Sequence, residues 1–414
     1  MVQVKSVDVA VIGGGPAGMA AAVSAKKSGV EKVLIVERNS RLGGILNQCI
    51  HTGFGLELFK EDLTGPEYAQ KYADLVESEK VDILLDTTVL SIGKNKIITF
   101  CNRAGLSQVR AKSIILAMGC RERTRGMLCI PGTRPAGVYT AGVVQNLINL
   151  QGKLPGKEVV IIGSGDVGLI MARRLTLEGC NVKAVVELLP YSSGLPRNIV
   201  QCLEDYNIPL LLGHTVTGIH GRDRVAAVTI ARVDGIKPIP ATERKIKCDT
   251  LLLSVGLIPE NELSEGAGIL LDSVTGGPIV DDSYETSVSG IFSCGNVLHV
   301  HDIADYASLE AEVAGRSAAL YSKGGLDKPY DILVDASAGV RYVVPHRLRR
   351  LEDNVLFFRV ERPSKDRIVV VKADGKVVCR RLYKRMNPAE MVRLRLEGEL
   401  KGARKITVEV EGGV

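Results

Sequence analysis

The chain has 414 residues, of which 45% are hydrophobic and 24% are charged. This composition excludes a disordered, a collagen-like or a small disulfide-stapled protein, and the length predicts two or three domains. Fifty-three Lys and Arg against 47 Asp and Glu give a net charge of +6. The charge is unevenly placed, because residues 341–414 carry +9 whereas residues 1–340 carry −3.

The cysteine content and the hydropathy of the chain indicate where in the cell the protein is located. Nine cysteines are scattered along the chain with no CxxC pair and no close cluster, a usage that predicts a reduced, cytoplasmic protein. The apolar residues 7–25 are interrupted by glycines and proline at 13–16 and carry Asp8 where a signal peptide has positive charge. No apolar run approaches the roughly 18 residues that span a bilayer. We therefore expect neither a signal peptide nor a transmembrane segment.

An internal repeat organises the first 325 residues. Residues 7–12 form a strand-like run, followed by a glycine turn at 13–18, a small-residue helix ending at Gly29 and a second strand before Glu37. The same order recurs from 159 to 187, with the first glycine 24 positions before the acid in both copies. The pattern predicts two βαβ nucleotide-binding units of one design.

The glycine spacing has a physical cause. The first glycine allows the tight turn after the strand, the second lets the backbone approach a pyrophosphate, and the third lets the helix pack closely on the sheet. Phosphates then meet the free N–H groups at the positive end of the helix. Glu37 and Glu187 are predicted to accept hydrogen bonds from ribose hydroxyls. Two dinucleotides indicate one FAD and one nicotinamide nucleotide, and the charge of Glu187 favours NAD over NADP.

Three further stretches carry a family resemblance. Residues 113–119 are a hydrophobic run ending in A-x-G, residues 250–256 are a matching run, and residues 286–296 end in Cys294-Gly295-Asn296. Together with the two glycine turns they resemble the two-dinucleotide-binding-domain flavoproteins of the pyridine nucleotide–disulfide oxidoreductase superfamily, over roughly residues 5–325. The resemblance implies an α/β fold with two Rossmann-like domains. We expect an FAD domain at 1–122 and 257–330 and an NAD domain at 123–256.

The resemblance also implies the residues that hold each cofactor. For FAD they are Gly13, Gly15, Pro16, Ala17, Gly18, Glu37, Arg38, Gly44, Val89, Ala117, Gly119, Gly295 and Asn296. For NAD they are Gly163, Gly165, Asp166, Val167, Gly168, Glu187 and Gly256. Members of the superfamily usually have aspartate where this chain has Asn296, and we interpret the amide oxygen as a replacement acceptor for a ribityl hydroxyl of FAD.

A second departure concerns the redox-active thiols. Disulfide reductases of the superfamily place a cysteine pair after the Gly-Gly that follows the first acid. In this chain the stretch after Gly43-Gly44 contains one cysteine, Cys49, and His51 lies two positions further on. A thiol–flavin role for Cys49 and a proton-relay role for His51 are the candidate catalytic roles, and packing beside the flavin is the favoured alternative. Without two thiols the chain cannot pass electrons through an internal disulfide.

Two histidines precede the last helix of the resembling region. His299 and His301 are two positions apart, but the sequence offers no cysteine or third histidine nearby. A loop beside the flavin or a helix cap is therefore favoured, and no metal site is predicted. In the superfamily the helix that follows points its N-terminus at the flavin and stabilises negative charge on the reduced ring.

Residues 331–414 are expected to form a small, basic, β-rich domain. Strand-like runs lie at 342–344, 355–358, 368–371 and 406–410, and Asp374-Gly375 is a two-residue hairpin signal. Asn387-Pro388 is typical of a helix start before the apolar-basic alternation of 391–396. The basic charge indicates either a solvated face or docking onto an acidic partner subunit. Nucleic-acid binding is disfavoured, because no binding motif is present.

Stretches 43–55, 119–124, 130–142 and 254–261 resemble the FAD- and NAD-binding subunits of multi-subunit dehydrogenases, closest to the subunit paired with anaerobic-type glycerol-3-phosphate dehydrogenase. The resemblance implies hydride exchange between FAD and NAD, and electron exchange with a partner flavoprotein in a hetero-oligomer. Alternatives are a stand-alone NADH oxidase or NADH:quinone reductase, a subunit of a proline or other amino-acid dehydrogenase, and a non-catalytic scaffold. The sequence leaves the substrate and the direction of electron flow open.

Overall fold

The computed structural model describes residues 5–326, 332–349, 354–396 and 402–412. Its contacts divide the chain into two compact units, one made of residues 1–120 and 259–414 and the other of residues 121–258. The chain passes between the units through β9 (Cys120–Glu122) and β19 (Leu257–Pro259). The expected α/β fold with Rossmann-like sheets is confirmed.

The first unit is built on a seven-stranded sheet in the order β5-β2-β1-β8-β7-β6, with β20 paired to β8. Its strands are β1 (Lys5–Ile12), β2 (Val33–Val36), β5 (Asp82–Leu84), β6 (Thr88–Ile92), β7 (Ile97–Asn102), β8 (Gly105–Leu116) and β20 (Ile291–Ser293). Strands β5, β2, β1, β8 and β20 pair in parallel. The carboxyl ends of β1, β8 and β20 therefore meet at one edge, where a ligand is expected in an open α/β sheet.

Two hydrophobic clusters cover the faces of this sheet. On one face pack α1 (Pro16–Lys27), α2 (Gly65–Ser78) and α8 (Ala304–Ser322), through small side chains such as Ala21, Ala22 and Ala314. On the other face residues of β6, β7 and β8 pack with the region of α7 (Glu262–Gly266). Gly315 of α8 has no room for a side chain, because a Cβ would lie 2.2 Å from the carbonyl oxygen of Ala21. This close approach explains why both helices are rich in small residues.

Short elements connect these helices and strands. They are η1 (Gly44–Gln48), β3 (Thr52–Phe54), β4 (Leu63–Thr64), η2 (Lys94–Lys96) and η5 (Gly295–Val297). Thr64 caps α2 through a capping box with Glu67, in which Thr64 Oγ1 accepts from the Glu67 N–H at 3.4 Å. Asp305, in the first turn of α8, accepts the Gly55 N–H at 3.1 Å. The Gly65 N–H donates to the Cys49 carbonyl at 2.8 Å, so the segment from Cys49 to Gly55 is held at both ends.

The second unit has a parallel five-stranded sheet in the order β10-β18-β11-β12-β13. Its strands are β10 (Val138–Thr140), β11 (Glu158–Ile162), β12 (Asn181–Glu187), β13 (Leu210–Leu212) and β18 (Thr250–Leu253). Helices α4 (Ala141–Asn149), α5 (Asp166–Leu177) and α6 (Pro196–Cys202) pack on one face, and an antiparallel layer of β14 (His214–Gly221), β15 (Val225–Asp234) and β17 (Arg244–Lys247) packs on the other. Short pieces complete the unit: α3 (Arg125–Leu128), η3 (Glu204–Tyr206), β16 (Lys237–Pro238) and η4 (Pro240–Thr242).

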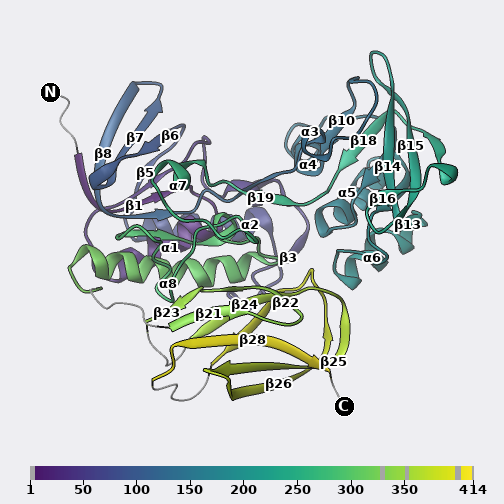
Figure 1. Cartoon of the computed structure of the whole chain (residues 1–414). Helices are drawn as coiled ribbons and strands as arrows, with labels where there is room; N and C mark the ends of the chain where they lie inside the picture. The colour runs from purple at the N-terminus through teal and green to yellow at the C-terminus, as the bar shows by residue number, and fades with distance from the viewer. Residues whose placement is uncertain (1–4, 327–331, 350–353, 397–401, 413–414) are drawn as a thin grey trace. The chain divides into compact units, whose positions relative to one another are not determined.

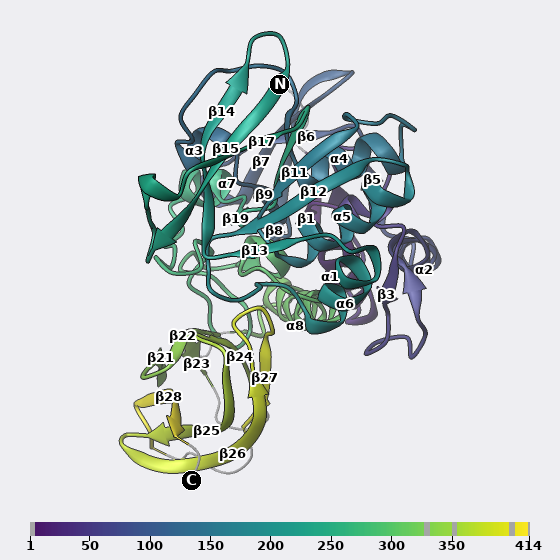
Figure 2. The ribbon, with the colours of Figure 1, turned by 90° about the vertical axis from the view of Figure 1, so that its right-hand side faces the viewer.

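The C-terminal region of the first unit is a β structure with its own core, as predicted (Figure 1). One sheet runs β23-β21-β28-β25-β26 and another runs β22-β24-β27. The strands are β21 (Ile332–Ala336), β22 (Val340–Val344), β23 (Arg347–Leu348), β24 (Val355–Val360), β25 (Ser364–Ala373), β26 (Lys376–Met386), β27 (Val392–Arg395) and β28 (Lys405–Gly412). In both views β26 lies on the side of this region remote from α8 (Figure 1 and Figure 2).

Two local predictions for this region have opposite outcomes. The hairpin at Asp374-Gly375 is confirmed, since both residues have positive φ (45° and 82°) between β25 and β26, as a two-residue hairpin turn requires. The helix expected after Asn387-Pro388 is wrong. Residues 392–395 form β27, which pairs antiparallel with β24, because alternating residues such as Leu394 are buried in the β core.

Candidate flavin and nucleotide sites

The first glycine turn joins β1 to α1 in the first unit. Gly13 has φ of +103°, and a Cβ there would lie 2.4 Å from the Ala117 carbonyl oxygen. A Cβ on Gly18 would lie 1.8 Å from the Gly13 carbonyl oxygen. Gly15, in contrast, has no atom within 4 Å of the place a Cβ would occupy. The first and last glycines of the turn are therefore packed against backbone atoms. The middle glycine has open space beside it, where a pyrophosphate is expected.

Glu37 lies at the end of β2 and faces this turn. It is 5% exposed, and its Oε2 accepts the Gly14 N–H at 2.6 Å while Oε1 accepts the Asn39 N–H at 2.8 Å. These bonds orient the carboxylate and leave acceptor capacity for a ribose, because an ionised carboxylate has about four acceptor sites. Arg38, the next residue, is exposed.

Gly43 and Gly44 bring a second loop against the first turn. The Gly43 N–H donates to the Gly14 carbonyl at 2.8 Å, and a Cβ on Gly44 would lie 3.1 Å from the Gly15 Cα. Cys49 follows at the other end of η1, where its Sγ donates to the Ile45 carbonyl at 3.4 Å. The structure therefore places Gly44 beside the glycine turn and puts Cys49 one short helix away.

His51 belongs to the same segment. Its ring stacks on Phe54 with a centroid separation of 5.1 Å, and its Nδ1 lies 3.1 Å from the Thr52 carbonyl oxygen. No disulfide joins any of the nine cysteines, all of which lie within the described residues. These local contacts fit the packing role that the sequence favoured for His51, while its proton-relay role stays a prediction.

Two more segments complete the candidate flavin site. Ala117 continues β8 and its N–H donates to the Ile12 carbonyl at 2.9 Å, while Gly119 has φ of +75° and no atom within 4 Å of a Cβ position. Gly295, with φ of +73°, approaches the start of α1 so closely that a Cβ would lie 2.7 Å from the Ala17 Cβ. The tertiary structure therefore gathers glycines from four separate segments around the N-terminus of α1, a cradle that fits a dinucleotide.

Val89 and Asn296, two of the residues predicted to hold FAD, make contacts within the protein itself. Val89 lies in β6 and packs against the hydrophobic cluster on the far face of the sheet, and its cofactor role stays a prediction. Asn296 uses its Oδ1 to accept the His301 backbone N–H at 2.9 Å. A ribityl hydroxyl would therefore share this oxygen with the backbone.

The second glycine turn repeats the first one in the second unit. A Cβ on Gly163, whose φ is +91°, would lie 1.9 Å from the Ser254 carbonyl oxygen. A Cβ on Gly168 would lie 2.8 Å from the Gly163 carbonyl oxygen. Gly165 is the open position, with only the Ser193 Oγ at 3.9 Å. Val167 is 39% exposed at the start of α5, and Gly256 has φ of +97°.

Glu187 is buried, with 5% of its surface exposed. Its Oε2 accepts the Ser164 N–H at 2.8 Å and the Ser164 hydroxyl at 2.5 Å, and its Oε1 accepts the Leu189 N–H at 3.0 Å. The simple alternative to a nucleotide-binding role, a solvated acid at the end of a strand, does not fit this burial. Asp166 faces inward too, because its Oδ1 accepts the Leu195 N–H at 2.8 Å and the Asn198 amide at 2.7 Å. Sequence reasoning missed Ser193 and Asn198, which no motif marks.

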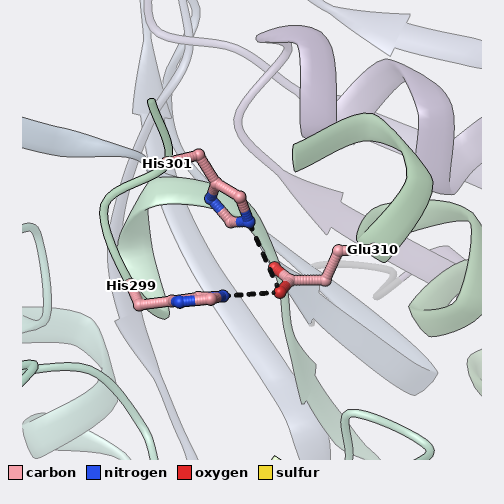
Figure 3. Close-up of side chains that lie close together, drawn as sticks. All are labelled: His299, His301 and Glu310. Carbon is pink, nitrogen blue, oxygen red and sulfur yellow. Dashed lines mark hydrogen bonds and ion pairs between the residues drawn. The ribbon is translucent and has the colours of Figure 1, made fainter. Parts of the chain in front are cut away.

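A third cluster consists of His299, His301 and Glu310, drawn in Figure 3. The His299 Nε2 lies 2.7 Å from Glu310 Oε2, and the His301 Nε2 lies 3.5 Å from the same oxygen. Burial lowers the pKa of His299 to about 4. Burial alone would raise the pKa of Glu310, but the two imidazoles outweigh it and bring the pKa to about 2. A neutral His299 therefore donates to an ionised Glu310.

Glu310 also connects this cluster to the candidate flavin site. Its second oxygen, Oε1, accepts the Gly295 N–H at 2.7 Å. The C-terminal β structure closes the other side, where Tyr342 and Phe357 contact the His299 ring with centroid separations of 5.9 and 6.0 Å. Sequence reasoning missed Glu310 because it lies on α8, and only the fold brings α8 back to the loop at 295–301.

The fold and the two glycine turns define a flavoprotein with two nucleotide-binding domains. The chain matches the pyridine nucleotide-disulphide oxidoreductase family over residues 7–317 and belongs to it. Members of this family bind FAD and NAD(P), so the chain is an FAD-dependent pyridine nucleotide oxidoreductase.

Two curated relatives are named as components of larger enzymes. Hydrogen cyanide synthase subunit HcnB of Pseudomonas protegens is 28% identical over 341 residues, which is 76% of this chain and 70% of that protein. An opine oxidase subunit of Agrobacterium tumefaciens is 28% identical over 337 residues, and the match covers 76% of this chain. The match spans 64% of that relative.

Among solved structures, thioredoxin reductase of T. acidophilum has a TM-score of 0.62 and 26% identity, covering 77% of this chain and 99% of that one. The C-terminal β structure lies outside the family match. Among the described residues, no helix combines the length and the apolar character needed to cross a membrane.

Proposed function

We propose that this chain is the FAD- and NAD-binding subunit of a multi-subunit dehydrogenase of the glycerol-3-phosphate dehydrogenase type. The observation that carries the proposal is the lack of a dithiol in a chain of this family. The sequence has no CxxC pair, and no disulfide joins its nine cysteines. Electrons that reach the flavin therefore have no exit through an internal disulfide, which needs two thiols, and NAD or a partner protein is the exit that we propose.

The proposal assigns a role to each glycine turn. Residues 13–18, Glu37, Gly44, Gly119 and Gly295 would hold FAD, and residues 163–168 with Glu187 would hold NAD. When bound, these cofactors supply hydride exchange between nicotinamide and flavin. The chain's own part is to orient them: the N-termini of α1 and α5 face the phosphates, and the buried carboxylates of Glu37 and Glu187 face the riboses.

The C-terminal β structure offers a surface for a partner protein. Strand β26 is at one end of its sheet, and its residues Lys376, Val378, Arg380, Leu382 and Lys384 are all exposed. Leu382 is 63% exposed, unusually high for a large apolar side chain. The register of β26 shifts between 377 and 379, and beyond this shift Arg380, Leu382 and Lys384 lie at alternate positions and share one side of the strand. We call these three residues the β26 face. Its combination of positive charge and an apolar side chain is complementary to an acidic partner with an apolar centre.

The first experiment is anaerobic mixing of the FAD-loaded chain with NADH, followed by the bleaching of flavin absorbance. The second is mild purification of the native complex, with identification of the chains that co-purify and assay of glycerol-3-phosphate-dependent NAD⁺ reduction. We expect rapid bleaching, a second flavoprotein chain and NADH formation. An FAD-loaded chain that NADH cannot bleach, in a complex that cannot reduce NAD⁺, would contradict the proposal.

A second candidate is a component of a proline or other amino-acid dehydrogenase. The likeness to the opine oxidase component of Agrobacterium tumefaciens supports it. The same purified complex separates the two candidates, because it would reduce NAD⁺ or a dye with an amino acid and would not respond to glycerol 3-phosphate. A stand-alone NADH oxidase or quinone reductase, in contrast, would turn over oxygen or quinone analogues as an isolated chain.

A further inference from the structure

The cluster of His299, His301 and Glu310 is enclosed by protein on all described sides. The exposed fractions of the three side chains are 1%, 2% and 0%. His299 and His301 come from the loop after η5, and Glu310 comes from the second turn of α8 (Figure 3). Phe357 of β24 packs over both imidazoles at centroid separations of 6.0 and 6.3 Å. Three groups that commonly ligate metals therefore meet at one place shielded from bulk solvent.

Hydrogen bonding orients the imidazole of His301. Asn296 Oδ1 accepts the His301 backbone N–H at 2.9 Å, so this atom is the carbonyl oxygen of the amide and cannot donate. The same oxygen lies 3.4 Å from the His301 Nδ1. Nδ1 is therefore the ring nitrogen placed to donate to this oxygen, and Nε2 is the ring nitrogen left for another ligand. Metal-binding histidines commonly donate their other ring N–H to an oxygen acceptor, and the Asn296 amide oxygen is placed for that role.

The Nε2 of His301 faces the Glu310 carboxylate. Its Nε2 lies 3.5 Å from Glu310 Oε2, and within the described residues this nitrogen has no hydrogen-bond partner. When the imidazole is neutral, two acceptors face each other in a buried site and repel, and the desolvated carboxylate adds a further cost. A cation between them removes both penalties.

The three ligand atoms have a suitable spacing for such a cation. One atom from each of His299, His301 and Glu310 lies within 4.8 Å of the other two. Bonds of about 2.0–2.2 Å to imidazole nitrogen and carboxylate oxygen require only small side-chain movements from these positions. Two nitrogens and one oxygen suit zinc and its first-row neighbours better than calcium or magnesium. Beside the cluster lies one ion pair of opposite charges, in which a guanidinium nitrogen of Arg359 is 3.6 Å from Asp302 Oδ1.

We propose that His299, His301 and Glu310 bind a divalent transition-metal ion of the zinc class. When the ion binds, the hydrogen of His299 moves from Nε2 to Nδ1, a buried atom without a hydrogen-bond partner among the described residues. Both histidines then bind through Nε2 as neutral imidazoles, Glu310 binds through a carboxylate oxygen, and a water molecule completes the coordination. Its role is structural: it joins the loop at 295–301 to α8 beneath the C-terminal sheets. Because Glu310 also holds the Gly295 N–H, the ion would stabilise the turn that faces the candidate flavin site. The inference rests on these side chains and is independent of the proposed dehydrogenase partner.

The test uses the full chain and zinc itself. We expect about one zinc per chain in protein purified with zinc present, measured by elemental analysis after gel filtration. X-ray absorption at the zinc edge should show nitrogen and oxygen ligands with imidazole scattering and no sulfur. This measurement needs no variant, so it remains decisive if a substitution prevents folding. Sulfur ligands, or no stoichiometric zinc in the chelator-treated and reloaded chain, would overturn the proposal.

Variants locate the site. His301→Ala and Glu310→Gln should each weaken zinc binding by more than about 100-fold in a competition titration with a chelating dye, since even loss of an outer-shell partner costs 10–100-fold. His214→Ala is the matched control, because His214 lies in β14 of the other unit and should bind zinc as the unmodified chain does. Equal zinc affinity in all three variants would overturn the assignment.

Discussion

Glu310 accepts the backbone N–H of Gly295 with one carboxylate oxygen at 2.7 Å, and it uses the other oxygen to contact the two histidines. Gly295 is the residue whose turn approaches the start of α1. A buried carboxylate on α8 therefore connects the candidate flavin site to the loop that the C-terminal sheets cover. This connection and the two glycine turns can be tested by substitution.

Substitution of Glu310 should loosen the flavin site. Glu310→Leu removes the acceptor of the Gly295 N–H and leaves that group unpaired in a buried place, which costs roughly 1–3 kcal/mol. Glu310→Gln keeps an amide oxygen for the same bond. We expect the leucine variant to lose FAD during gel filtration and the glutamine variant to retain most of it, as measured by the ratio of flavin to protein absorbance. Equal retention would show that this bond does not support the turn.

The middle glycine of each turn should separate binding from folding. Gly15 has φ of −76° and open space at its Cβ position, so Gly15→Ala should fold normally and lose FAD, because the methyl group occupies the path of the pyrophosphate. Gly13→Ala is the contrasting variant, since its φ of +103° and its contact with the Ala117 carbonyl make a side chain incompatible with the fold. Circular dichroism and flavin content check both. A Gly15→Ala protein with full FAD would place the cofactor elsewhere.

The same logic applies to the second turn. Gly165 has φ of −67° and an open Cβ position. Gly165→Ala should retain FAD yet be reduced by NADH only at much higher concentrations, in stopped-flow measurements of flavin absorbance. Unchanged half-saturation by NADH would contradict the assignment of this turn to the nicotinamide nucleotide.

Glu187 should set the preference for NADH over NADPH. Its buried carboxylate, held by Ser164, would repel the 2′-phosphate of NADPH. We expect the half-saturating concentration of NADPH to exceed that of NADH by at least about tenfold, which corresponds to 1.4 kcal/mol. Glu187→Ala should reduce this ratio mainly by weakening NADH. A chain that uses both nucleotides equally would contradict the prediction.

Arg349 should hold the C-terminal sheets to the flavin domain. Its guanidinium pairs with Asp281 at 2.5 Å and with Glu285, and the side chain is only 10% exposed. Arg349→Met leaves two buried carboxylates without their cation, so we expect a loss of about 3–5 kcal/mol in the free energy of unfolding, measured with urea. Arg380→Gln is the control. Arg380 pairs with Glu411 but is 55% exposed, so its loss should have little effect.

Asp281 should give this junction a pH dependence. Burial raises its pKa from 3.8 to about 6, although Arg349 opposes the shift. The native state therefore binds this proton more tightly than the unfolded chain, and the stabilisation that protonation provides is complete below pH 3.8 and disappears as the pH rises through about 6. Asp281→Asn should remove this component. The melting temperature of the unmodified chain relative to the variant should thus rise on acidification from neutral pH, and a constant difference would contradict the shift.

The β26 face can be tested for partner docking. Replacing Arg380 and Lys384 with glutamate should leave flavin reduction by NADH unchanged while weakening assembly of the native complex, because an acidic partner would then meet like charge. Lys245 and Lys247 of β17 are exposed residues of the other unit, and their replacement with glutamate is the matched control. Normal assembly of the β26 variant on gel filtration would remove this face from the interface.

Much of the fold and the candidate sites could be predicted from local patterns. The two glycine turns, the acids that end β2 and β12 and the hairpin at Asp374-Gly375 are all encoded within short stretches, because strand, turn and helix signals act over a few residues. The absence of a second thiol near Cys49 is equally a property of the sequence. These local signals determined that the chain binds two nucleotides and lacks an internal dithiol.

Only the tertiary structure decided which distant residues meet. Glu310 reaches Gly295 and the histidines because α8 packs back against α1, and Arg349 reaches Asp281 because the C-terminal sheets fold onto the flavin domain. The alternation at 391–396 follows a typical helix start at Asn387-Pro388, yet pairing with β24 makes it a strand. Contacts of this kind depend on burial and strand pairing between segments far apart in the chain, and no short pattern records them.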